Sequence, residues 1–348
     1  MNFTVSEIKK VCEKLGIKPS RNLGQNFLID KNILDQIVAA GELGSEDTIL
    51  EIGPGFGVLT QKLVKRAGKV VAVEKDRRLY EFLKSEIRNQ KSEIGGKKNN
   101  LEIINEDVLK ISNFQFPISN EISNDKFQIQ NHKWKIISNL PYSISTQVLW
   151  KFLHYDYLSP ALSLPRGGGL ELMVLMLQKE VGERICAKPG KMSILSVLCQ
   201  LYADCEIVSV VGRNCFWPVP EVDSVIVKLN IRNVNTSPQS SPYKGEGVDN
   251  NATTLSQPVK TCSQQLLTYK GEGVDNKELM RIVKIGFSAK RKMLKNNLSG
   301  GLNLPMEKIV EVLKSVGLNE KVRAQELGVG EWVKVCEKIL NLENKLQI

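Results

Sequence analysis

Histidine and paired cysteines are scarce in this sequence. Of its 348 residues only two are histidine, and the seven cysteines are scattered along the chain without a Cys-x-x-Cys pair. A structural zinc site needs four closely spaced Cys or His ligands, and a disulfide framework uses cysteines in even numbers. We therefore expect neither a metal centre nor a disulfide framework.

Long hydrophobic runs and an excess of acidic residues are also missing. No apolar stretch reaches the roughly 18 to 20 residues that span a bilayer, and residues 1–18 carry charges where a signal peptide would have an apolar centre. Lysine and arginine together number 48 against 38 acidic residues, which leaves a net charge of +10. These features indicate a cytoplasmic protein without a membrane partner, and the basic excess favours a polyanion such as nucleic acid.

One long stretch, residues 233–276, lacks the periodicity of a helix or strand and is rich in Asn, Ser, Thr, Gln, Pro and Gly. We predict a linker here. Inside it the octapeptide at 243–250 recurs identically at 269–276. Two copies are too few to stack as a structural repeat, so a duplicated insertion that does not pack is favoured over a tethering or recognition motif. Residues 113–133 and 159–169 are predicted to be enlarged surface loops.

The chain before this linker alternates between two patterns. Short apolar runs rich in β-branched residues alternate with amphipathic stretches, which predicts an α/β fold with a largely parallel sheet. The last two runs leave no room for a crossover helix between them and should pair antiparallel. The predicted strands are Thr48–Ile52, Lys69–Glu74, Leu101–Asn105, Trp134–Ser138, Leu172–Leu177, Ile207–Val211 and Ser224–Leu229.

Only helical periodicity follows the linker, at 277–298, 306–315 and 331–342. The chain is therefore predicted to combine a Rossmann-like sheet domain with a much smaller helical domain. The predicted division is 1–232 for the sheet domain with the functional site, 233–276 for the linker, and 277–348 for the helical domain.

A glycine-rich turn follows the first predicted strand. Gly53 and Gly55 lie between that strand and an amphipathic helical segment, where glycines let a ligand approach the backbone closely. The next strand ends at Glu74, about 20 residues beyond Gly53, a spacing typical of an acid that accepts hydrogen bonds from ribose hydroxyls. The pattern indicates a nucleoside-containing cofactor, and a dinucleotide is one reading of it.

Two residues near the turn favour a different cofactor. Pro54 removes an amide donor and Glu51 adds a carboxylate, and both serve a pyrophosphate poorly. A cofactor with a cationic centre and an amino acid tail suits them better. Asp107 follows the third strand, at the sheet edge where such folds bind ligands, and its carboxylate can accept a hydrogen bond from a purine amine.

The fourth predicted strand leads into the tetrapeptide Asn139-Leu140-Pro141-Tyr142. The Asn139 side-chain carbonyl and the backbone carbonyl before Pro141 can both accept hydrogen bonds from one planar NH2 group, and Tyr142 can stack on the attached base. An ordinary turn after a strand is the competing interpretation. The position beside the glycine turn favours the functional one.

Five motifs, in order and spacing, resemble the ribosomal RNA adenine dimethyltransferases, and the closest likeness is to the bacterial small-subunit (16S) branch of that family. Phe287, Arg291-Lys292 and residues 296–298 extend the likeness almost to the end of the chain. The motifs occupy 24–28, 51–55, 139–142, 177–181 and 216–224.

The resemblance implies S-adenosyl-L-methionine as methyl donor and adenine in small-subunit ribosomal RNA as acceptor. It implies dimethylation of adjacent adenosines near the RNA 3′ end, on an immature small subunit, and we expect the enzyme to be a monomer. For the cofactor site it implies Asn26, Leu28, Glu51, Gly53, Gly55, Glu74, Asp107 and Asn139. For the target base it implies Asn139, Pro141, Tyr142 and Phe216, with the two aromatic rings as a clamp.

A basic run lies in the predicted helical domain. Lys290, Arg291, Lys292 and Lys295 fall within six residues of one predicted helix and are predicted to bind RNA phosphates. A solvated helix face is the alternative. The family usually has Gln and paired Arg at the start of this run, so the detail of the phosphate contacts differs here.

Three other functions stay open at this point. One is a large-subunit (23S) dimethyltransferase that confers antibiotic resistance, and another is a dinucleotide-dependent oxidoreductase. The third is a ribosome-assembly or RNA-binding factor that keeps the fold without turnover. The combined presence of the glycine turn, the strand-end acids and the tetrapeptide argues against a pure binding protein.

Overall fold

The computed structural model describes residues 4–19, 26–90, 100–111, 134–153, 169–232 and 275–346. The predicted loop at 113–133, nearly all of that at 159–169 and the linker up to residue 274 lie outside the described residues. The same holds for the first octapeptide, for most of the second, and for Gly24 and Gln25.

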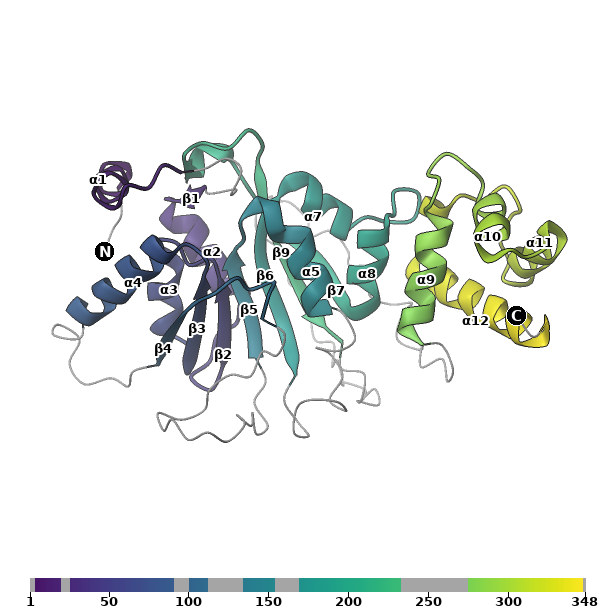
Figure 1. Ribbon diagram of the computed structural model, residues 1–348, viewed down its shortest axis with the longest axis horizontal. Helices are drawn as coiled ribbons and strands as arrows, with labels where there is room; N and C mark the ends of the chain where they lie inside the picture. Colours follow the sequence, from purple (N-terminus) through teal and green to yellow (C-terminus); the bar gives the residue numbers. More distant parts are fainter. Residues whose placement is uncertain are drawn as a thin grey trace, which may run out of the picture.

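A seven-stranded sheet with the order β4-β3-β2-β5-β6-β9-β7 forms the centre of the protein (Figure 1). The strands from β4 to β6 in this order pair parallel, whereas β9 pairs antiparallel with both β6 and β7. The predicted strands, the α/β fold and the antiparallel pairing of the last two strands are confirmed. A two-stranded ribbon joins β1 (Phe27–Leu28) to β8 (Phe216–Trp217). The sheet strands are β2 (Thr48–Ile52), β3 (Lys69–Glu74), β4 (Leu101–Asn105), β5 (Trp134–Asn139), β6 (Leu170–Gln178), β7 (Ala203–Val211) and β9 (Ser224–Ile231).

The strand order reverses between β2 and β5. On one side the chain continues outward through β3 and β4, and on the other through β6. Such a reversal leaves a crevice at the carboxyl ends of parallel strands, which is where open α/β sheets bind ligands. The glycine turn after β2 and the tetrapeptide after β5 therefore meet at this crevice.

Helices cover both faces of the sheet (Figure 1). Ile49 and Ile137 belong to the hydrophobic cluster that contains α2 and α3, whereas Leu50 and Ile136 belong to the cluster on the other face with α5 and α8. Burial on both faces explains why the strands read as nearly continuous apolar runs. A third cluster packs α1 over the glycine turn. The helices of this part are α1 (Val5–Leu15), α2 (Lys31–Ala40), α3 (Val58–Val64), α4 (Arg77–Gln90), α5 (Ser145–Leu153), α7 (Lys179–Ile185) and α8 (Ile194–Tyr202).

The C-terminal part is helical, as predicted, but its first predicted helix is wrong in length. The apolar spacing over 277–298 indicated one helix, whereas the structure has two helices joined by a loop at 287–293. The last two residues of the predicted linker belong to the start of the first of these helices, since Asp275 is its N-cap and Asn276 its first residue. The helices of this part are α9 (Asn276–Gly286), α10 (Leu294–Leu302), α11 (Met306–Ser315) and α12 (Val329–Leu346).

Contacts between distant residues explain the break between α9 and α10. A side chain at Gly286 would come within 2.3 Å of the indole ring of Trp332, so only glycine lets the end of α9 approach α12 this closely. The side-chain amide of Asn297 donates hydrogen bonds to the backbone carbonyls of Gly286, at 2.6 Å, and Ala289, at 3.1 Å. These bonds stabilise the turn after α9. The spacing of apolar residues continues unchanged across this turn, so it does not reveal that the helix ends there.

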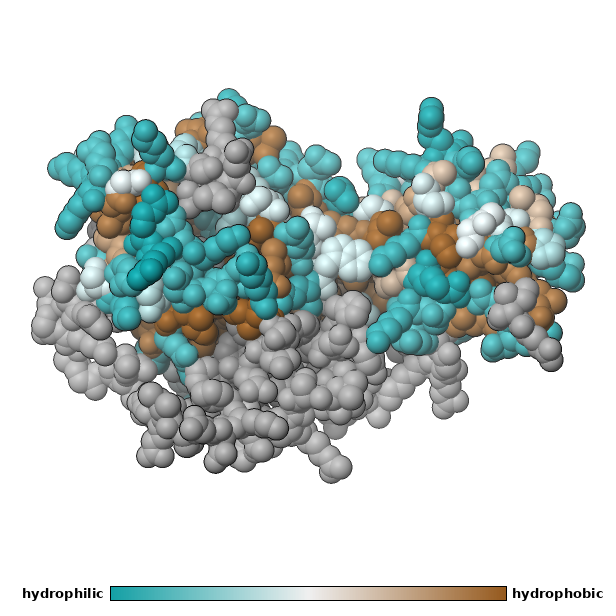
Figure 2. All heavy atoms as spheres, in the orientation of Figure 1, coloured by the Kyte–Doolittle hydropathy of each residue, from teal (hydrophilic) through white to brown (hydrophobic). Residues whose placement is uncertain are grey.

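The C-terminal helices pack against the sheet part through α8. One hydrophobic cluster continues from the sheet into α9 to α12, and the backbone amides of Gly190 and Met192 donate to the Gln325 carbonyl at 2.8 and 3.1 Å. The Lys284 ammonium lies 5.1 Å from the centre of the Trp150 ring. Figure 2 shows the outline of the molecule narrowing at this junction, with hydrophilic side chains on both sides of it. The predicted domain boundaries remain a prediction.

Within the described ranges, no helix is long and apolar enough to cross a membrane. No group of three or more His, Cys, Asp or Glu side chains in the same ranges is placed to hold a metal ion. The six cysteines that the structure describes are free thiols.

Candidate active site

The glycine turn between β2 and α3 has a backbone that favours glycine. Gly53, Gly55 and Gly57 have φ angles of 67°, 59° and 78°, all in the left-handed region that other residues rarely adopt. A side chain at Gly53 would lie 3.3 Å from the Pro141 ring, and one at Gly55 would lie 3.3 Å from the Phe27 ring. The glycine turn therefore packs closely against both the β1 segment and the tetrapeptide, which leaves little room for a side chain at Gly53 or Gly55.

A cavity of about 360 Å³ opens at the carboxyl ends of β2, β3 and β5. Its size lies in the range of small-molecule sites, which are typically about 300 to 1,000 Å³. The cavity brings together ten residues that were predicted as site residues from separate parts of the sequence. Asp76 and Val108 are among the lining residues that were not predicted. The ten are Asn26, Leu28, Glu51, Gly53, Gly55, Glu74, Asp107, Asn139, Pro141 and Tyr142.

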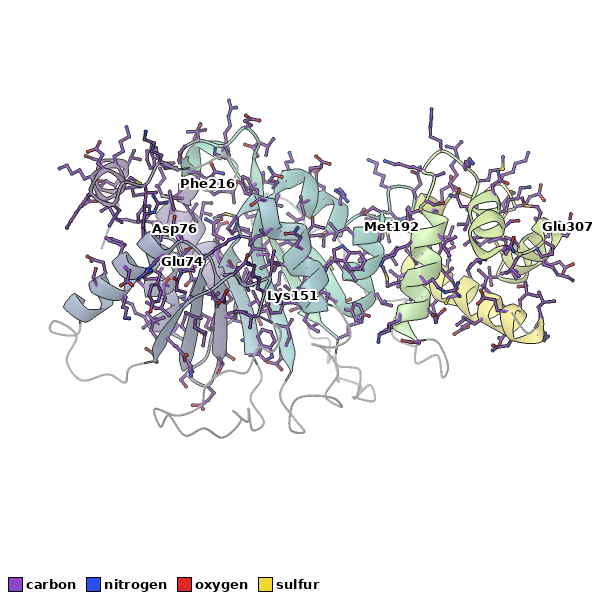
Figure 3. All side chains as sticks on the ribbon, in the orientation of Figure 1. Glu74, Asp76, Lys151, Met192, Phe216 and Glu307 are labelled. Carbon is purple, nitrogen blue, oxygen red and sulfur yellow. The ribbon has the colours of Figure 1, made fainter. Side chains whose placement is uncertain are left out.

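Two buried carboxyl groups lie in the wall of this cavity. Glu51 is only 2% exposed, and its Oε2 atom has no hydrogen-bond partner in the described part of the chain. Burial raises the pKa of Glu51 to about 8, and the nearby Glu74 carboxylate contributes to the increase. Glu74 accepts hydrogen bonds from the amides of Gly55, at 3.1 Å, and Asp76, at 2.8 Å, and burial raises its pKa as well. Figure 3 shows Glu74 and Asp76 together beyond the end of β3.

Asp107 differs from these two acids because it has a cationic partner. Its Oδ2 atom lies 3.0 Å from the Lys75 ammonium, and Oδ1 accepts a hydrogen bond from the Leu109 amide. Burial is the largest single influence on Asp107 and opposes its ionisation, but the hydrogen bonds from Lys75 and the Leu109 amide, together with the charge of Lys75, outweigh burial and lower the pKa of the carboxyl. Lys151 of α5, labelled in Figure 3, donates to the carbonyls of Leu109 and Ile111 and so holds the loop after β4 in place.

Asn139 and Leu140 of the tetrapeptide line the cavity, and each carries a carbonyl group that can accept a hydrogen bond. The Asn139 amide nitrogen is 3.5 Å from the Asn26 carbonyl, an orientation in which the Asn139 side-chain oxygen is left to accept. Within the described residues no hydrogen bond occupies the Leu140 carbonyl. The Pro141 carbonyl accepts from the Ile144 amide at 3.1 Å and closes the turn. Two acceptors on one rigid turn suit a planar amine.

The two aromatic residues predicted as a clamp lie in different surroundings. Tyr142 is half-buried in the cavity wall, and its hydroxyl is 2.6 Å from the Ser224 hydroxyl. Phe216 is 1% exposed, packs in the cluster with α2, and pairs with Leu28 in the β1–β8 ribbon. Figure 3 shows Phe216 above Glu74, beside the strands β1 and β8. The predicted second stacking face is therefore not available in this structure, because the ribbon buries the Phe216 ring.

The basic residues also differ from their predicted arrangement. Lys290, Arg291 and Lys292 are exposed in the loop between α9 and α10, not on a helix. Lys295 lies in α10, and its ammonium is 3.7 Å from the Glu320 carboxylate. A loop gives the first three side chains more freedom to follow an irregular backbone of phosphates than a helix face would.

Most of the chain is similar in sequence to known proteins. Residues 17–248 match the family described as Ribosomal RNA adenine dimethylase. A relative from Dehalococcoides mccartyi, named Ribosomal RNA small subunit methyltransferase A, is 34% identical over 332 residues, which are 95% of this chain and 92% of the relative. This chain belongs to the ribosomal RNA adenine dimethylase family. A Bacillus cereus relative with the same name is 34% identical over 342 residues, 97% of each chain.

Solved structures share the fold of this dimethylase. A dimethyladenosine transferase from Plasmodium falciparum superposes with a TM-score of 0.63 and 26% identity, and the match covers 92% of this chain and 98% of that one. The 23S rRNA methyltransferase ErmE superposes with a TM-score of 0.57 at 20% identity, covering 90% and 99%. Family membership makes this protein a methyltransferase, which implies a methyl donor and excludes the oxidoreductase reading of the glycine turn.

The structure adds residues to the site of this dimethylase that the sequence did not single out. Asp76 lies two residues after Glu74, lines the cavity and pairs with Arg78 at 2.8 Å. Ser224 belongs to a motif that carried the resemblance, yet its contact with Tyr142 joins residues 82 positions apart. The short spacing between Glu74 and Asp76 was a usable signal, whereas no local signal reports the contact of Ser224.

The buried Glu51 carboxyl predicts a pH dependence of stability. Because its pKa is near 8 in the folded protein and near 4.5 otherwise, the folded state holds a proton that the unfolded state releases between these values. Its contribution to stability is therefore complete below about pH 4.5 and is lost as pH rises toward 8. Glu51→Gln should not lose stability in this way. As pH rises from 5 to 8, its free energy of unfolding relative to that of wild type should increase by on the order of 4 kcal/mol.

Urea denaturation of wild type and Glu51→Gln at pH 5, 6, 7 and 8 measures this gain. The exposed Glu81→Gln variant of α4 is the matched control and should follow wild type at every pH. A stability difference between wild type and Glu51→Gln that is the same at pH 5 and pH 8 would show that the Glu51 carboxyl does not titrate as described.

Proposed function

We propose that this dimethylase uses S-adenosyl-L-methionine to dimethylate the exocyclic amines of adjacent adenosines near the 3′ end of small-subunit (16S) ribosomal RNA. The step belongs to the biogenesis of the small subunit, and the immature particle is the substrate. The observation that carries the proposal is the single cavity in which Glu51, Glu74 and Asp107 face Asn139 and Tyr142. The names of the relatives at 34% identity support the choice of the small subunit.

The cavity residues fit this methyl donor. Gly53 and Gly55 line the cavity without side chains, so a ligand can approach their backbone closely. The unpartnered oxygen of Glu51 beside them suits a ligand whose positive charge favours ionisation of the carboxyl. Glu74 would hold the ribose hydroxyls, and Asp107 would accept from the adenine amine. Asn26 and Leu28 would close the cavity from the β1 side. When bound, the donor supplies a methyl group on a cationic sulfur.

The tetrapeptide orients the acceptor. Asn139 Oδ1 and the Leu140 carbonyl accept the two hydrogens of the target amine, which directs the nitrogen lone pair outward. These hydrogens become more positive as the nitrogen gives up its lone pair, so both hydrogen bonds are strongest in the transition state. Tyr142 supports the base plane. The chain contributes orientation without a covalent nucleophile, and the released proton passes to water.

A mapping experiment tests the proposal. The protein is incubated with radiolabelled S-adenosylmethionine and either small or large subunits that lack adenine methylation, and the labelled nucleotides are identified. We expect dimethyladenosine near the 3′ end of the small-subunit RNA alone. Label in the large subunit would favour the 23S activity, and binding to the small subunit without label would favour an assembly factor.

A further inference from the structure

One hydrogen bond links the tetrapeptide to a strand from a distant part of the sequence. Ser224 is the first residue of β9, is fully buried, and pairs with Gln178 of β6 and Val211 of β7. Its hydroxyl lies 2.6 Å from the hydroxyl of Tyr142. Within the described residues, neither hydroxyl has a second hydrogen-bond partner.

The two ends of this bond differ in how firmly they are held. Tyr142 begins a three-residue turn, η2 (Tyr142–Ile144), and its ring reaches from there into the cavity wall. Ser224 lies between two neighbouring strands, and the preceding residue, Asp223, accepts hydrogen bonds from the amides of Lys179, at 2.9 Å, and Arg213, at 3.0 Å. The rigid end is therefore in the sheet, and the end that faces the cavity is in a short turn.

Burial explains why the serine hydroxyl needs this partner. A buried hydroxyl without a hydrogen-bond partner destabilises the folded state. The Ser224 and Tyr142 hydroxyls therefore favour the one arrangement in which they bond to each other. A tyrosine ring fixed at its backbone and at its hydroxyl has a defined plane. A ring that is free at its hydroxyl can rotate about its side-chain bonds and presents a less defined face to a base.

We infer that Ser224 is a positioning residue for methyl transfer, which acts through the Tyr142 hydroxyl to fix the plane on which the target adenine stacks. The inference rests on the proposed function, because it assigns the stacking face to Tyr142. The burial of Phe216 gives this single bond more weight, since Tyr142 is the one of the two predicted aromatic residues that reaches the cavity.

A double-mutant cycle tests the inference in the full-length protein. Wild type, Ser224→Ala, Tyr142→Phe and the double variant are assayed on small subunits lacking adenine methylation, at saturating S-adenosylmethionine. We expect each single variant to lower kcat about three- to tenfold, and the double variant to be no slower than Tyr142→Phe alone. The Kd for S-adenosylmethionine, measured by calorimetry, should change less than about twofold, because the bond orients the acceptor and not the donor.

Ser196→Ala is the matched control. Ser196 is also fully buried, and its hydroxyl donates to the Arg184 carbonyl at 2.6 Å, away from the residues that line the cavity. Its loss should lower the thermal midpoint without lowering kcat. A purely structural role for Ser224 would give the same pattern as this control.

The outcomes separate the inference from the proposed function. A wild-type enzyme that does not methylate small subunits would overturn both. An active wild type with an unchanged kcat in Ser224→Ala would overturn the inference alone, as would a Ser224→Ala effect that persists in the Tyr142→Phe background. If Ser224→Ala does not fold, Tyr142→Phe removes the same bond from its half-buried end, and an unchanged kcat in that variant overturns the inference.

Discussion

Asn139→Ala should lower kcat for methyl transfer to small-subunit RNA by about 10²- to 10³-fold, the range found when one preorganised hydrogen-bonding group for the transition state is removed. The Asn139 amide nitrogen lies 3.5 Å from the Asn26 carbonyl, which leaves the side-chain oxygen to accept from the amine of the target base. Alanine removes that acceptor. The Kd for S-adenosylmethionine should rise less than kcat falls, because the other cavity residues remain.

Single-turnover rates on small subunits and calorimetric binding of the methyl donor measure the two effects separately. Asn100→Ala is the matched control, since the Asn100 amide donates to the carbonyls of Val64 and Ala67 and stabilises the fold elsewhere. Wild-type rates in Asn139→Ala, or an equal loss in Asn100→Ala, would contradict the assignment of Asn139 to the target amine.

The second large effect concerns the basic loop between α9 and α10. Replacing Lys290, Arg291 and Lys292 together by alanine should weaken RNA binding about 10- to 100-fold near 150 mM salt and reduce the slope of log K against log salt by about 2 to 3. These side chains are exposed, so the thermal midpoint should not change. Binding to small subunits is measured over a series of salt concentrations.

A second triple variant separates the position of the charges from their number. Lys308, Lys314 and Lys338 are exposed on α11 and α12, and their replacement by alanine removes an equal number of positive charges from other positions of the same helical part. We expect this variant to bind RNA much more tightly than the loop variant. Equal losses in both would mean that the overall charge of +10, and not the loop, governs binding.

Much of the catalytic sheet could be predicted because its signals are local. Each strand is a short apolar run buried on both faces, and each run is legible without knowledge of its neighbours. The glycine turn, Glu74 and the tetrapeptide follow directly on strand ends, and parallel strands bring such ends to one edge. The position of these residues around one cavity therefore followed from their order along the chain.

The remaining features depend on contacts between segments that lie far apart in sequence. The helix predicted over 277–298 is broken because Gly286 meets Trp332 and Asn297 caps the turn, and the apolar spacing alone does not report either contact. The same break moved the basic residues from a helix to a loop. Phe216 was predicted to face the base, but its pairing with Leu28 across the β1–β8 ribbon buries it.

The sequence by itself determined the family, the strands in their order along the chain and ten of the residues that line the cavity, because these depend on residue type and short spacing. The tertiary structure alone decided the pKa of Glu51 near 8 and the hydrogen bond between Tyr142 and Ser224. Desolvation and hydrogen-bond geometry arise only when distant segments pack together, and no residue pattern along the chain specifies them.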